Sequence, residues 1–299
     1  MAIAAHQQGQ LRLTATQPPR ELSDEQLRHF AEHGWVIQEG AFTAEECALF
    51  RQALDRLDER EYCPGPHNWD GGDIHNIDNQ INSGEQIFLD WITHPHILPV
   101  LWQLLGAPPT FEGCHAMIKH PHPLRHDQAE AAKLADPENF GWHRGMRPKW
   151  GMVDSDLGPG FANTTFLNNC TYLTDIDSEL DGGTAILDGS HLTDTGDPIA
   201  DKQAHLHTSY KKITKIKAGS VVHFTECTIH SGVPVLSERT RYTMFYGFTP
   251  PWQRVWKTPA GDCGPSQEVV DAAEGVLKDI LAPDHNYGGQ YDLVAKPKL

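Results

Sequence analysis

The pattern of apolar and polar residues near the N-terminus predicts a helix followed by a short strand. Ser23 has the chemistry of a helix N-cap, and Gln26 three residues later completes a capping box in front of an apolar stripe. Gly34 is expected to end this helix, because glycine readily adopts the left-handed conformation that closes a helix. The apolar residues at 35–37 are typical of a short strand.

Two further helices are expected before residue 106. Thr43 caps the first of them, whose apolar residues recur at three- and four-residue steps, namely Cys47, Phe50, Leu54 and Leu57. Residues 63–84 are rich in Gly, Asn, Asp and His without any period, which predicts a loop. Residues 88–105 return to helical spacing, with an interruption around Pro95.

From Phe111 onward the pattern changes to short runs rich in β-branched and aromatic residues, separated by clusters of Gly, Pro and Asp. Such runs are typical of antiparallel strands. We expect these strands at 111–119, 164–173, 183–187, 219–224 and 240–248. They indicate a barrel or jelly roll rather than alternating βαβ units. Helical spacing returns only at 267–281, where a last helix is predicted.

The elements predict a single domain over residues 21–299, mainly β with flanking helices. Its helical part is expected at 21–110, its β core at 111–252, and a C-terminal helix and tail at 253–299. Residues 1–20 are polar and end beside two prolines, so we expect a flexible arm there. No apolar stretch approaches the roughly 18 residues of a membrane-spanning helix, and no leader of the secretory type is expected.

Composition favours a small-molecule partner. The 299 residues are 39% hydrophobic, enough for a substantial core, and carry a net charge of -16. That charge argues against nucleic acid and membrane partners, because phosphate backbones and anionic lipids would be repelled. Six cysteines without a CxxC pair fit reduced thiols in a cytoplasmic protein: Cys47, Cys63, Cys114, Cys170, Cys227 and Cys263. The oligomeric state does not follow from the sequence.

Eighteen histidines offer many possible metal ligands, and most are discounted. Those in loops or at helix ends are more often solvated or hydrogen-bonded than ligating; they are His6, His33, His67, His94, His96, His120, His122 and His126. His143 and His230 differ because of the residues around them.

Four fragments of the chain resemble a known family in their order and spacing. They are LRHFAEHGWVIQEGAFTAEECALF (27–50), GWH (141–143), LTDIDSELDGGTAILDGSH (173–191) and AGSVVHFTECTIHSGVPVLSERTRYTMFYGF (218–248). Together they resemble the phytanoyl-CoA dioxygenase family, although Asp188 stands where that family usually has proline.

The resemblance spans residues 22–252 and implies a double-stranded β-helix, a cupin-like jelly roll. It implies an oxygenase that uses iron(II), 2-oxoglutarate and molecular oxygen to hydroxylate or otherwise oxidise a C–H bond of a small molecule. It also implies that His143 and His230 bind iron and that Arg241 anchors 2-oxoglutarate. His230 follows His143 by 87 positions and Arg241 follows His230 by 11, as in the family, which favours Arg241 over Arg239.

These residue types suit that chemistry. An iron(II) that must also bind oxygen and a bidentate oxo-acid needs three protein ligands on one side, commonly two histidines and a carboxylate. A guanidinium gives the distant carboxylate of the co-substrate a two-pronged partner that lysine does not match.

The family's usual aspartate ligand is missing. Two residues after His143 the chain has Gly145, and Glu226 is the expected replacement. A regular strand would separate Glu226 from His230 by roughly 13 Å, so both reach one ion only if the chain bends between them. A glycine after the first histidine with FTE before the second resembles a bacterial branch of the family, which favours Glu226 as a ligand. Alternatively, Glu226 orients a ligating imidazole without touching the ion.

Other interpretations remain open. The resemblance extends to halogenases, in which a small residue at the position of Gly145 leaves room for chloride on the iron. A non-catalytic jelly-roll binding module, metal-free or zinc-binding, is a second alternative. Asp154 and Asp156 are weaker substitutes for the missing ligand, because they are more typical of turn residues beside the glycines that follow.

Three more residues are candidates for contacts to 2-oxoglutarate. Lys119 ends a predicted strand, and a lysine at this place in the family approaches the carboxylate of the co-substrate. Thr171, on a predicted strand, and Ser231, directly after His230, are candidates for hydrogen bonds to the same acid. Ordinary strand packing is the competing interpretation for each.

Two groups of residues are candidates for the entrance of the site. Aromatic and basic residues around His143 are expected to form a substrate wall, or alternatively a cover over the barrel mouth: Trp142, Arg144, Met146, Arg147 and Trp150. Polar residues of the predicted long loop are candidates for a lid: Asn76, Asn79 and Asn82.

Overall fold

The computed structural model describes residues 11–13, 17–60, 62, 71–253 and 264–282. Most of the predicted flexible arm, the tail beyond residue 282, and Cys63, His67 and Cys263 lie outside the described residues. The part of the arm at 11–13 is docked. Leu11 and Leu13 pack on the core, and the backbone N–H of Leu13 donates to the Asp90 carboxylate at 2.9 Å.

The larger of two facing β-sheets has six antiparallel strands, in the order β1-β9-β6-β11-β3-β2. The strands are β1 (Trp35–Gln38), β2 (Ile74–Asp78), β3 (Thr110–Lys119), β6 (Leu167–Tyr172), β9 (Val221–Thr225) and β11 (Arg241–Thr249). β11 pairs with β3 over its whole length and lies in the middle of the sheet. It therefore ties the N-terminal part of the chain to the later strands.

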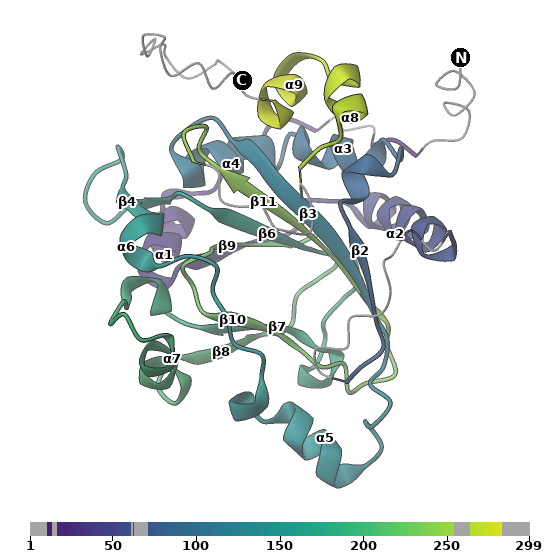
Figure 1. Cartoon of the computed structure of the whole chain (residues 1–299), viewed down its shortest axis with the longest axis vertical. Helices are drawn as coiled ribbons and strands as arrows, with labels where there is room; N and C mark the ends of the chain where they lie inside the picture. The colour runs from purple at the N-terminus through teal and green to yellow at the C-terminus, as the bar shows by residue number, and fades with distance from the viewer. Residues whose placement is uncertain (1–10, 14–16, 61, 63–70, 254–263, 283–299) are drawn as a thin grey trace.

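The smaller sheet faces the larger one in Figure 1 and has the order β10-β7-β8. Its strands are β7 (Gly183–Leu187), β8 (Tyr210–Ile213) and β10 (His230–Val233), and a separate hairpin is formed by β4 (Met152–Asp154) and β5 (Ala162–Thr164). Side chains from both sheets meet in one apolar cluster that includes Tyr172, Phe224 and Ile186. The architecture is the predicted jelly roll, mainly β with flanking helices.

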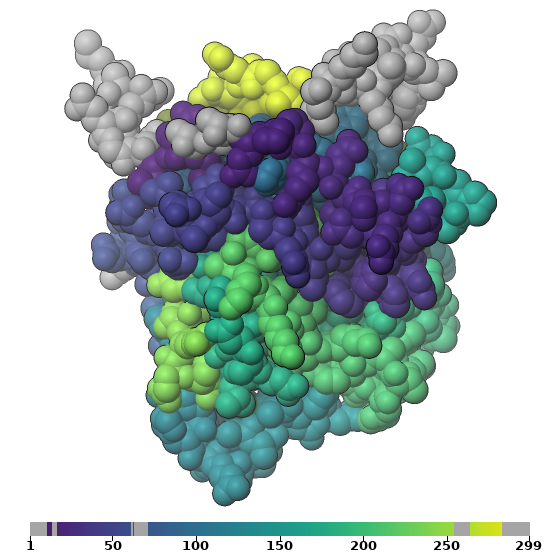
Figure 2. Space-filling model, turned by 180° about the vertical axis from the view of Figure 1, so that it is seen from behind, coloured from purple at the N-terminus to yellow at the C-terminus, as the bar shows by residue number. Residues whose placement is uncertain are grey.

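Helices cover the outer face of the larger sheet, while α5 and α7 lie beside the smaller sheet (Figure 1). The helices are α1 (Asp24–His33), α2 (Ala44–Glu59), α3 (Ile87–Ile92), α4 (Leu98–Leu105), α5 (Gln128–Ala135), α6 (Pro148–Gly151), α7 (Pro198–Leu206), α8 (Gln267–Ala272) and α9 (Gly275–Leu281). Ser23 and Thr43 form the predicted capping boxes of α1 and α2, and Gly34 ends α1 at a φ of 81°. Figure 2 shows the N-terminal helices, in purple, lying across the back of the molecule above the green strands and loops.

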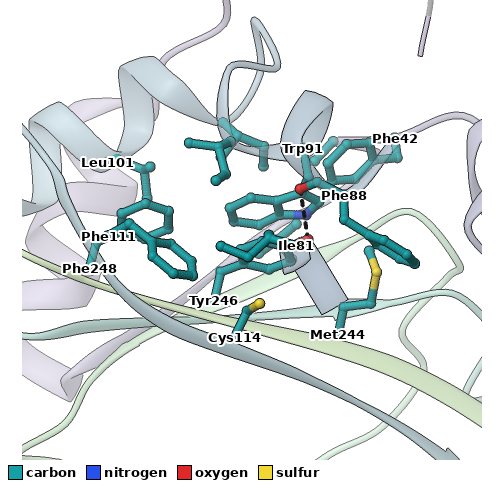
Figure 3. Close-up of a cluster of buried hydrophobic side chains, with 14 of the residues drawn as sticks. Phe42, Ile81, Phe88, Trp91, Leu101, Phe111, Cys114, Met244, Tyr246 and Phe248 are labelled. Carbon is teal, nitrogen blue, oxygen red and sulfur yellow. Dashed lines mark hydrogen bonds between the residues drawn. The ribbon is translucent and has the colours of Figure 1, made fainter. Parts of the chain in front are cut away.

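The main core lies between these helices and the larger sheet (Figure 3). Trp91 of α3 stacks on Tyr246 of β11 with ring centroids 4.0 Å apart. The polar atoms of both rings are satisfied: Trp91 Nε1 donates to Thr171 Oγ1, and Tyr246 Oη donates to the Phe88 carbonyl, each at 2.9 Å. The side of β11 that carries Met244, Tyr246 and Phe248 therefore faces the helices, and the alternate residues face the smaller sheet.

Two sequence-based predictions about elements were wrong. Within the predicted loop 63–84, residues 74–78 form β2, where Ile74 and Ile77 are buried and the strand pairs with β3. The two isoleucines lie three positions apart, on opposite faces of the strand, so the sequence lacks the apolar alternation that would have revealed it. The C-terminal helix predicted at 267–281 is two helices, because Gly275 takes a φ of 56° and Ala273 is extended. The break around Pro95, between α3 and α4, is confirmed.

Among the described residues, no helix combines the length and the apolarity needed to cross a membrane.

Gly219 provides a test of how the helices are attached to the sheet. Its φ is 90°, its carbonyl accepts from the Phe42 N–H at 2.9 Å, and an added Cβ would lie 2.0 Å from the Phe42 carbonyl oxygen. Gly219→Ala should lower the free energy of unfolding by about 1–3 kcal/mol. Gly232→Ala is the control, because nothing lies within 4 Å of its Cβ position. Denaturant unfolding compares the two variants, and equal stabilities would contradict this packing.

Candidate functional site

His143 and His230 come together at one end of the smaller sheet. Their backbones form a reciprocal pair, in which the N–H of His143 donates to the carbonyl of His230 at 3.0 Å and the reverse bond is 2.9 Å. Their ring centroids lie 4.4 Å apart. Paired residues of antiparallel segments project their side chains to the same side, so this pairing holds the two imidazoles next to each other.

Each imidazole is oriented by a backbone carbonyl. His143 Nδ1 lies 2.8 Å from the Gly141 carbonyl, and His230 Nδ1 lies 2.9 Å from the Thr228 carbonyl. A carbonyl only accepts, so both Nδ1 atoms carry the proton and both Nε2 atoms are left as electron-pair donors. Burial, together with the charge of His143, lowers the pKa of His230 to about 3. His230 is therefore neutral at neutral pH, as a metal ligand must be.

The carboxylate of Glu226 occupies the space that a side chain at position 145 would fill. A Cβ built on Gly145 would lie 2.5 Å from Glu226 Oε1, and the backbone N–H of Gly145 donates to the Glu226 carbonyl at 3.2 Å. An aspartate at 145 and a glutamate at 226 thus compete for one volume. The missing side chain of Gly145 and the presence of Glu226 are two parts of one arrangement.

The chain bends between Glu226 and His230, as the sequence analysis required. β9 ends at Thr225 in the larger sheet, and His230 begins β10 in the smaller one. The Thr228 N–H donates to the Thr225 carbonyl at 2.9 Å and closes the turn. This crossing removes the separation that a continuous strand would impose on Glu226 and His230.

Glu226 is buried and its environment favours the neutral acid. Burial raises the pKa of Glu226 to about 8, and hydrogen bonding from Asn168 Nδ2 to Oε2 partly opposes that rise. A cation would compensate this buried carboxylate. Among the described residues, however, only Asp73, His75 and His120 bring three such ligand atoms within 4.8 Å of one another. Binding of one ion by Glu226 and both imidazoles of this site therefore requires a side-chain movement.

Arg241 begins β11 and is buried, with 4% of its surface exposed. Its Nη1 donates to the Gly183 carbonyl at 2.8 Å, whereas its Nε has no hydrogen-bond partner among the described residues. Thr243, on the same side of β11, has a buried hydroxyl that also lacks a partner among them. Lys119 lies directly opposite Arg241 on β3 and is buried too. Arg239, in contrast, is exposed and pairs with Asp177.

Two of the predicted co-substrate contacts point the wrong way. Thr171 lies on the outer face of β6, where its hydroxyl accepts from Trp91 in the helix layer. Ser231 follows His230 in β10, and the alternation of the strand turns its side chain away from the imidazole, toward the Gly232 carbonyl. Sequence reasoning placed both residues on the correct strands but could not assign their faces. Asn168 and Thr243 were missed because nothing in the local sequence distinguishes them.

A pocket of about 280 Å³ adjoins His143 and is lined by residues 143–147 and by Asp194, Gly196 and Pro198. Arg144 pairs with the buried Asp201, and Arg147 pairs with Asp194 at 2.6 Å. The predicted substrate wall is therefore partly present, with its guanidinium groups already paired.

The two tryptophans of the predicted substrate wall, Trp142 and Trp150, do not line this pocket. Trp142 packs on Tyr210 and donates to the Pro137 carbonyl at 2.8 Å, and Trp150 is exposed beside Arg147.

The predicted asparagine lid is not formed by the three asparagines named for it. Asn76 is buried in β2, and Asn79 starts a short turn at a φ of 51°. Asn82 Oδ1 accepts a hydrogen bond from the Ser266 N–H at 2.8 Å, near α8. All three are held by strand or turn structure. Asp154 and Asp156 are exposed at the β4–β5 hairpin, consistent with the turn interpretation.

Comparisons with known proteins identify the family of the chain and other structures with its fold. The family model described as phytanoyl-CoA dioxygenase (PhyH) matches residues 30–243, more than two thirds of the chain. No curated protein sequence matches the chain.

Several solved structures share the fold. HygX from Streptomyces hygroscopicus, with nickel and 2-oxoglutarate bound, is 18% identical over 79% of this chain and 90% of its own, with a TM-score of 0.59. The non-heme alpha ketoglutarate dependent carbocyclase SnoK, from nogalamycin biosynthesis, is 18% identical over 79% of this chain and 88% of its own, with a TM-score of 0.59. The epimerase SnoN from the same biosynthesis is 16% identical over 76% of this chain and 83% of its own, with a TM-score of 0.57.

Mutation of Thr171 tests its position beneath the helix layer. Thr171→Val keeps the side-chain shape but leaves the buried Trp91 N–H without an acceptor, which should cost about 1–3 kcal/mol of unfolding free energy. Thr243→Val is a matched buried control, because its hydroxyl has no partner to lose among the described residues. Thermal unfolding measures the difference, and 2-oxoglutarate affinity should be unchanged in Thr171→Val. A stable Thr171→Val protein with weakened 2-oxoglutarate binding would restore the original assignment.

Proposed function

The chain belongs to the phytanoyl-CoA dioxygenase family, and from that membership we propose an iron(II)- and 2-oxoglutarate-dependent oxygenase in which Glu226 supplies the carboxylate that Gly145 cannot. His143, His230 and Glu226 would hold the metal, and Arg241 would hold the co-substrate. The reaction is the oxidation of a C–H bond of a small molecule.

One observation carries the assignment of Glu226. Its carboxylate fills the space of a side chain at position 145, two residues after His143, whose ring lies 4.4 Å from that of His230 between centroids. The donor set of two imidazoles and one carboxylate suits a non-haem iron that keeps open positions for other ligands. To reach a metal held by the two imidazoles, the Glu226 side chain would have to turn away from Asn168 Nδ2, to which its Oε2 is hydrogen-bonded.

Arg241 fits the distant carboxylate of 2-oxoglutarate. Its Nε, which has no partner in the part of the chain that the structure describes, is a buried donor facing the space between the sheets, and the Thr243 hydroxyl adds a second donor on the same side of β11. Lys119 contributes a second positive charge from the paired strand. Buried donors without partners are costly, so a bound carboxylate would stabilise this wall.

The iron, 2-oxoglutarate and oxygen supply the oxidising chemistry when bound, and the chain supplies orientation and dryness. Phe224 packs on the His230 ring at a centroid distance of 4.6 Å, and the apolar cluster between the sheets keeps water away from one side of the site. The pocket beside His143 is the proposed substrate position. The Arg144–Asp201 and Arg147–Asp194 pairs at this pocket favour a polar substrate that accepts hydrogen bonds from the guanidinium groups and donates hydrogen bonds to the carboxylates.

Two relatives give context for the substrate class. HygX has been crystallised with hygromycin B, and SnoN with nogalamycin RO. We propose by analogy a polar natural product of similar kind. The chloride-dependent halogenase is not favoured, because the volume left by Gly145 is filled by Glu226 and offers no room for a halide. A non-catalytic module is not favoured either, since it gives no reason for a buried Arg241 Nε that lacks a partner among the residues described.

The proposed location is the cytoplasm, with residues 21–299 acting as one domain. Free thiols that are buried fit a reducing compartment. The described cysteines are all of this kind: Cys47, Cys114, Cys170 and Cys227.

Anaerobic titration tests the function. Iron(II) and 2-oxoglutarate added together should give a weak visible absorption band that neither gives alone, and oxygen should then convert 2-oxoglutarate to succinate. The absence of both would contradict the oxygenase assignment. Adding chloride should leave the band unchanged, whereas a shifted band and a chlorinated product would revive the halogenase alternative.

An exchange of carboxylates tests Glu226. Glu226→Ala should abolish iron(II) binding at micromolar concentration, measured by equilibrium dialysis, while His143→Ala serves as the positive reference for ligand loss. Gly145→Asp alone should impair folding or binding because its Cβ meets Glu226 at 2.5 Å. The double variant Gly145→Asp/Glu226→Ala should recover iron binding. Wild-type iron affinity in Glu226→Ala would rule out a ligand role.

Replacing the guanidinium tests the co-substrate site. Arg241→Lys keeps the charge but loses the two-pronged geometry, and should raise the KM for 2-oxoglutarate about 10–100-fold, the range expected for one lost charged hydrogen bond. Arg239→Lys is the control, because Arg239 is exposed and faces Asp177. Unchanged KM values in Arg241→Lys would remove Arg241 from the site.

A further inference from the structure

A second group of metal-ligating side chains lies away from the proposed iron site. Asp73, His75 and His120 each place one ligand atom within 4.8 Å of the others. Asp73 directly precedes β2, His75 lies within β2, and His120 directly follows β3. The two segments are tied by a hydrogen bond from the His120 N–H to the Asp73 carbonyl at 2.9 Å. The group is therefore carried by paired strands rather than by a loop.

The cluster is on the opposite face of the sheet from the oxygenase site. His75 is paired with Ile118, whose side chain belongs to the core under the helices, whereas its neighbour Ile74 is paired with Lys119. Because strand residues alternate between faces, His75 points to the outer side, toward Asp58 of α2. Figure 1 shows β2 at the edge of the larger sheet beside α2.

Both imidazoles are held by a second partner that leaves one nitrogen for an ion. His75 Nδ1 lies 2.8 Å from Asp58 Oδ1, and His120 Nδ1 lies 3.1 Å from the Thr240 hydroxyl. A carboxylate on the far nitrogen of a ligating histidine is the usual support of a zinc ligand, because it fixes the tautomer and strengthens the donor. His75 Nε2 is then directed at Asp73 Oδ1, 3.3 Å away.

We propose that Asp73, His75 and His120 form a binding site for a divalent transition metal, with zinc(II) as the preferred ion. Two ligands at about 2.0–2.1 Å from a tetrahedral zinc lie roughly 3.3 Å from each other, which matches the distance between His75 Nε2 and Asp73 Oδ1. Imidazole and carboxylate donors suit zinc better than calcium or magnesium. The Asp73 side chain is 56% exposed, so water is available as the fourth ligand.

The site has a structural consequence. It joins the start of β2 to the end of β3, at the sheet edge where β2 contributes five residues. His120 follows Lys119, and the Thr240 that supports His120 precedes Arg241. A bound ion would therefore brace the end of the strand pair that carries both proposed co-substrate cations, from the other side of the sheet.

A competing arrangement needs no metal. His75 as an imidazolium would bridge Asp58 and Asp73 through its two nitrogens, as two ordinary ion pairs. That arrangement makes no use of His120, and zinc would not stabilise it. The effect of changing His120 therefore separates the two.

Zinc titration of the full-length protein tests the proposal in a background that lacks both imidazoles of the proposed iron site. The double variant His143→Ala/His230→Ala, stripped with a chelator, should bind one equivalent of zinc by calorimetry, and zinc should raise its unfolding temperature. Adding His120→Ala should abolish this binding. Adding Asp58→Asn should weaken it about 10–100-fold, the range typical for loss of a partner that orients a ligand. His126→Ala is the matched control, since His126, six positions after His120 in the sequence, is an exposed histidine paired with Glu238.

Two results would contradict the zinc site. No zinc binding by the folded double variant, or undiminished binding after His120→Ala, would overturn the site. If the double variant does not fold by circular dichroism, wild-type protein and His120→Ala are compared directly, and the proposal requires one equivalent of zinc fewer in His120→Ala. Failure of the oxygenase assignment would appear instead as loss of iron-dependent 2-oxoglutarate turnover in the wild type, with the zinc result intact.

Discussion

The reciprocal backbone pair between His143 and His230 is the constraint on which the site depends. It joins a segment that has no other strand pairing to the first residue of β10, and so fixes two imidazoles 4.4 Å apart, centroid to centroid. Backbone pairing is insensitive to the side chains involved. The proposed change of the third ligand from position 145 to position 226 would therefore leave the two histidines in place.

The same geometry explains why Gly145 and Glu226 belong together. Position 145 donates its backbone N–H to the Glu226 carbonyl, so the two residues are neighbours whatever their side chains. Only one carboxylate fits in the shared volume. Glutamate has one more methylene than aspartate and reaches the volume from the turn after β9. Burial raises the pKa of Glu226 to about 8. A raised pKa is expected for a buried carboxyl group that has no cation beside it to stabilise its negative charge.

Much of the fold and several residues of the candidate site could be predicted from the sequence. The predictions that failed concern strand pairing and the direction of side chains on buried strands. The capping boxes at Ser23 and Thr43 are local signals. Family spacing singled out His143 and His230, whose rings lie 4.4 Å apart between centroids, and Arg241, which is buried. Thr171 was misplaced because its strand is buried on both faces, which removes the alternation that reveals direction. The edge strand β2 was missed because it pairs with β3, about forty residues later in the chain, and local sequence does not reveal such a pairing. The group of Asp73, His75 and His120 depends on the same pairing of β2 with β3.

The most direct measurement is anomalous diffraction at the iron edge from crystals grown without oxygen in the presence of iron(II) and 2-oxoglutarate. We expect an iron peak bonded to Nε2 of both His143 and His230 and to a carboxylate oxygen of Glu226, with the far end of 2-oxoglutarate on Arg241. An iron bound by the two imidazoles while Glu226 stays hydrogen-bonded to Asn168 would contradict the exchange of ligands. Iron found away from both imidazoles would contradict the site itself.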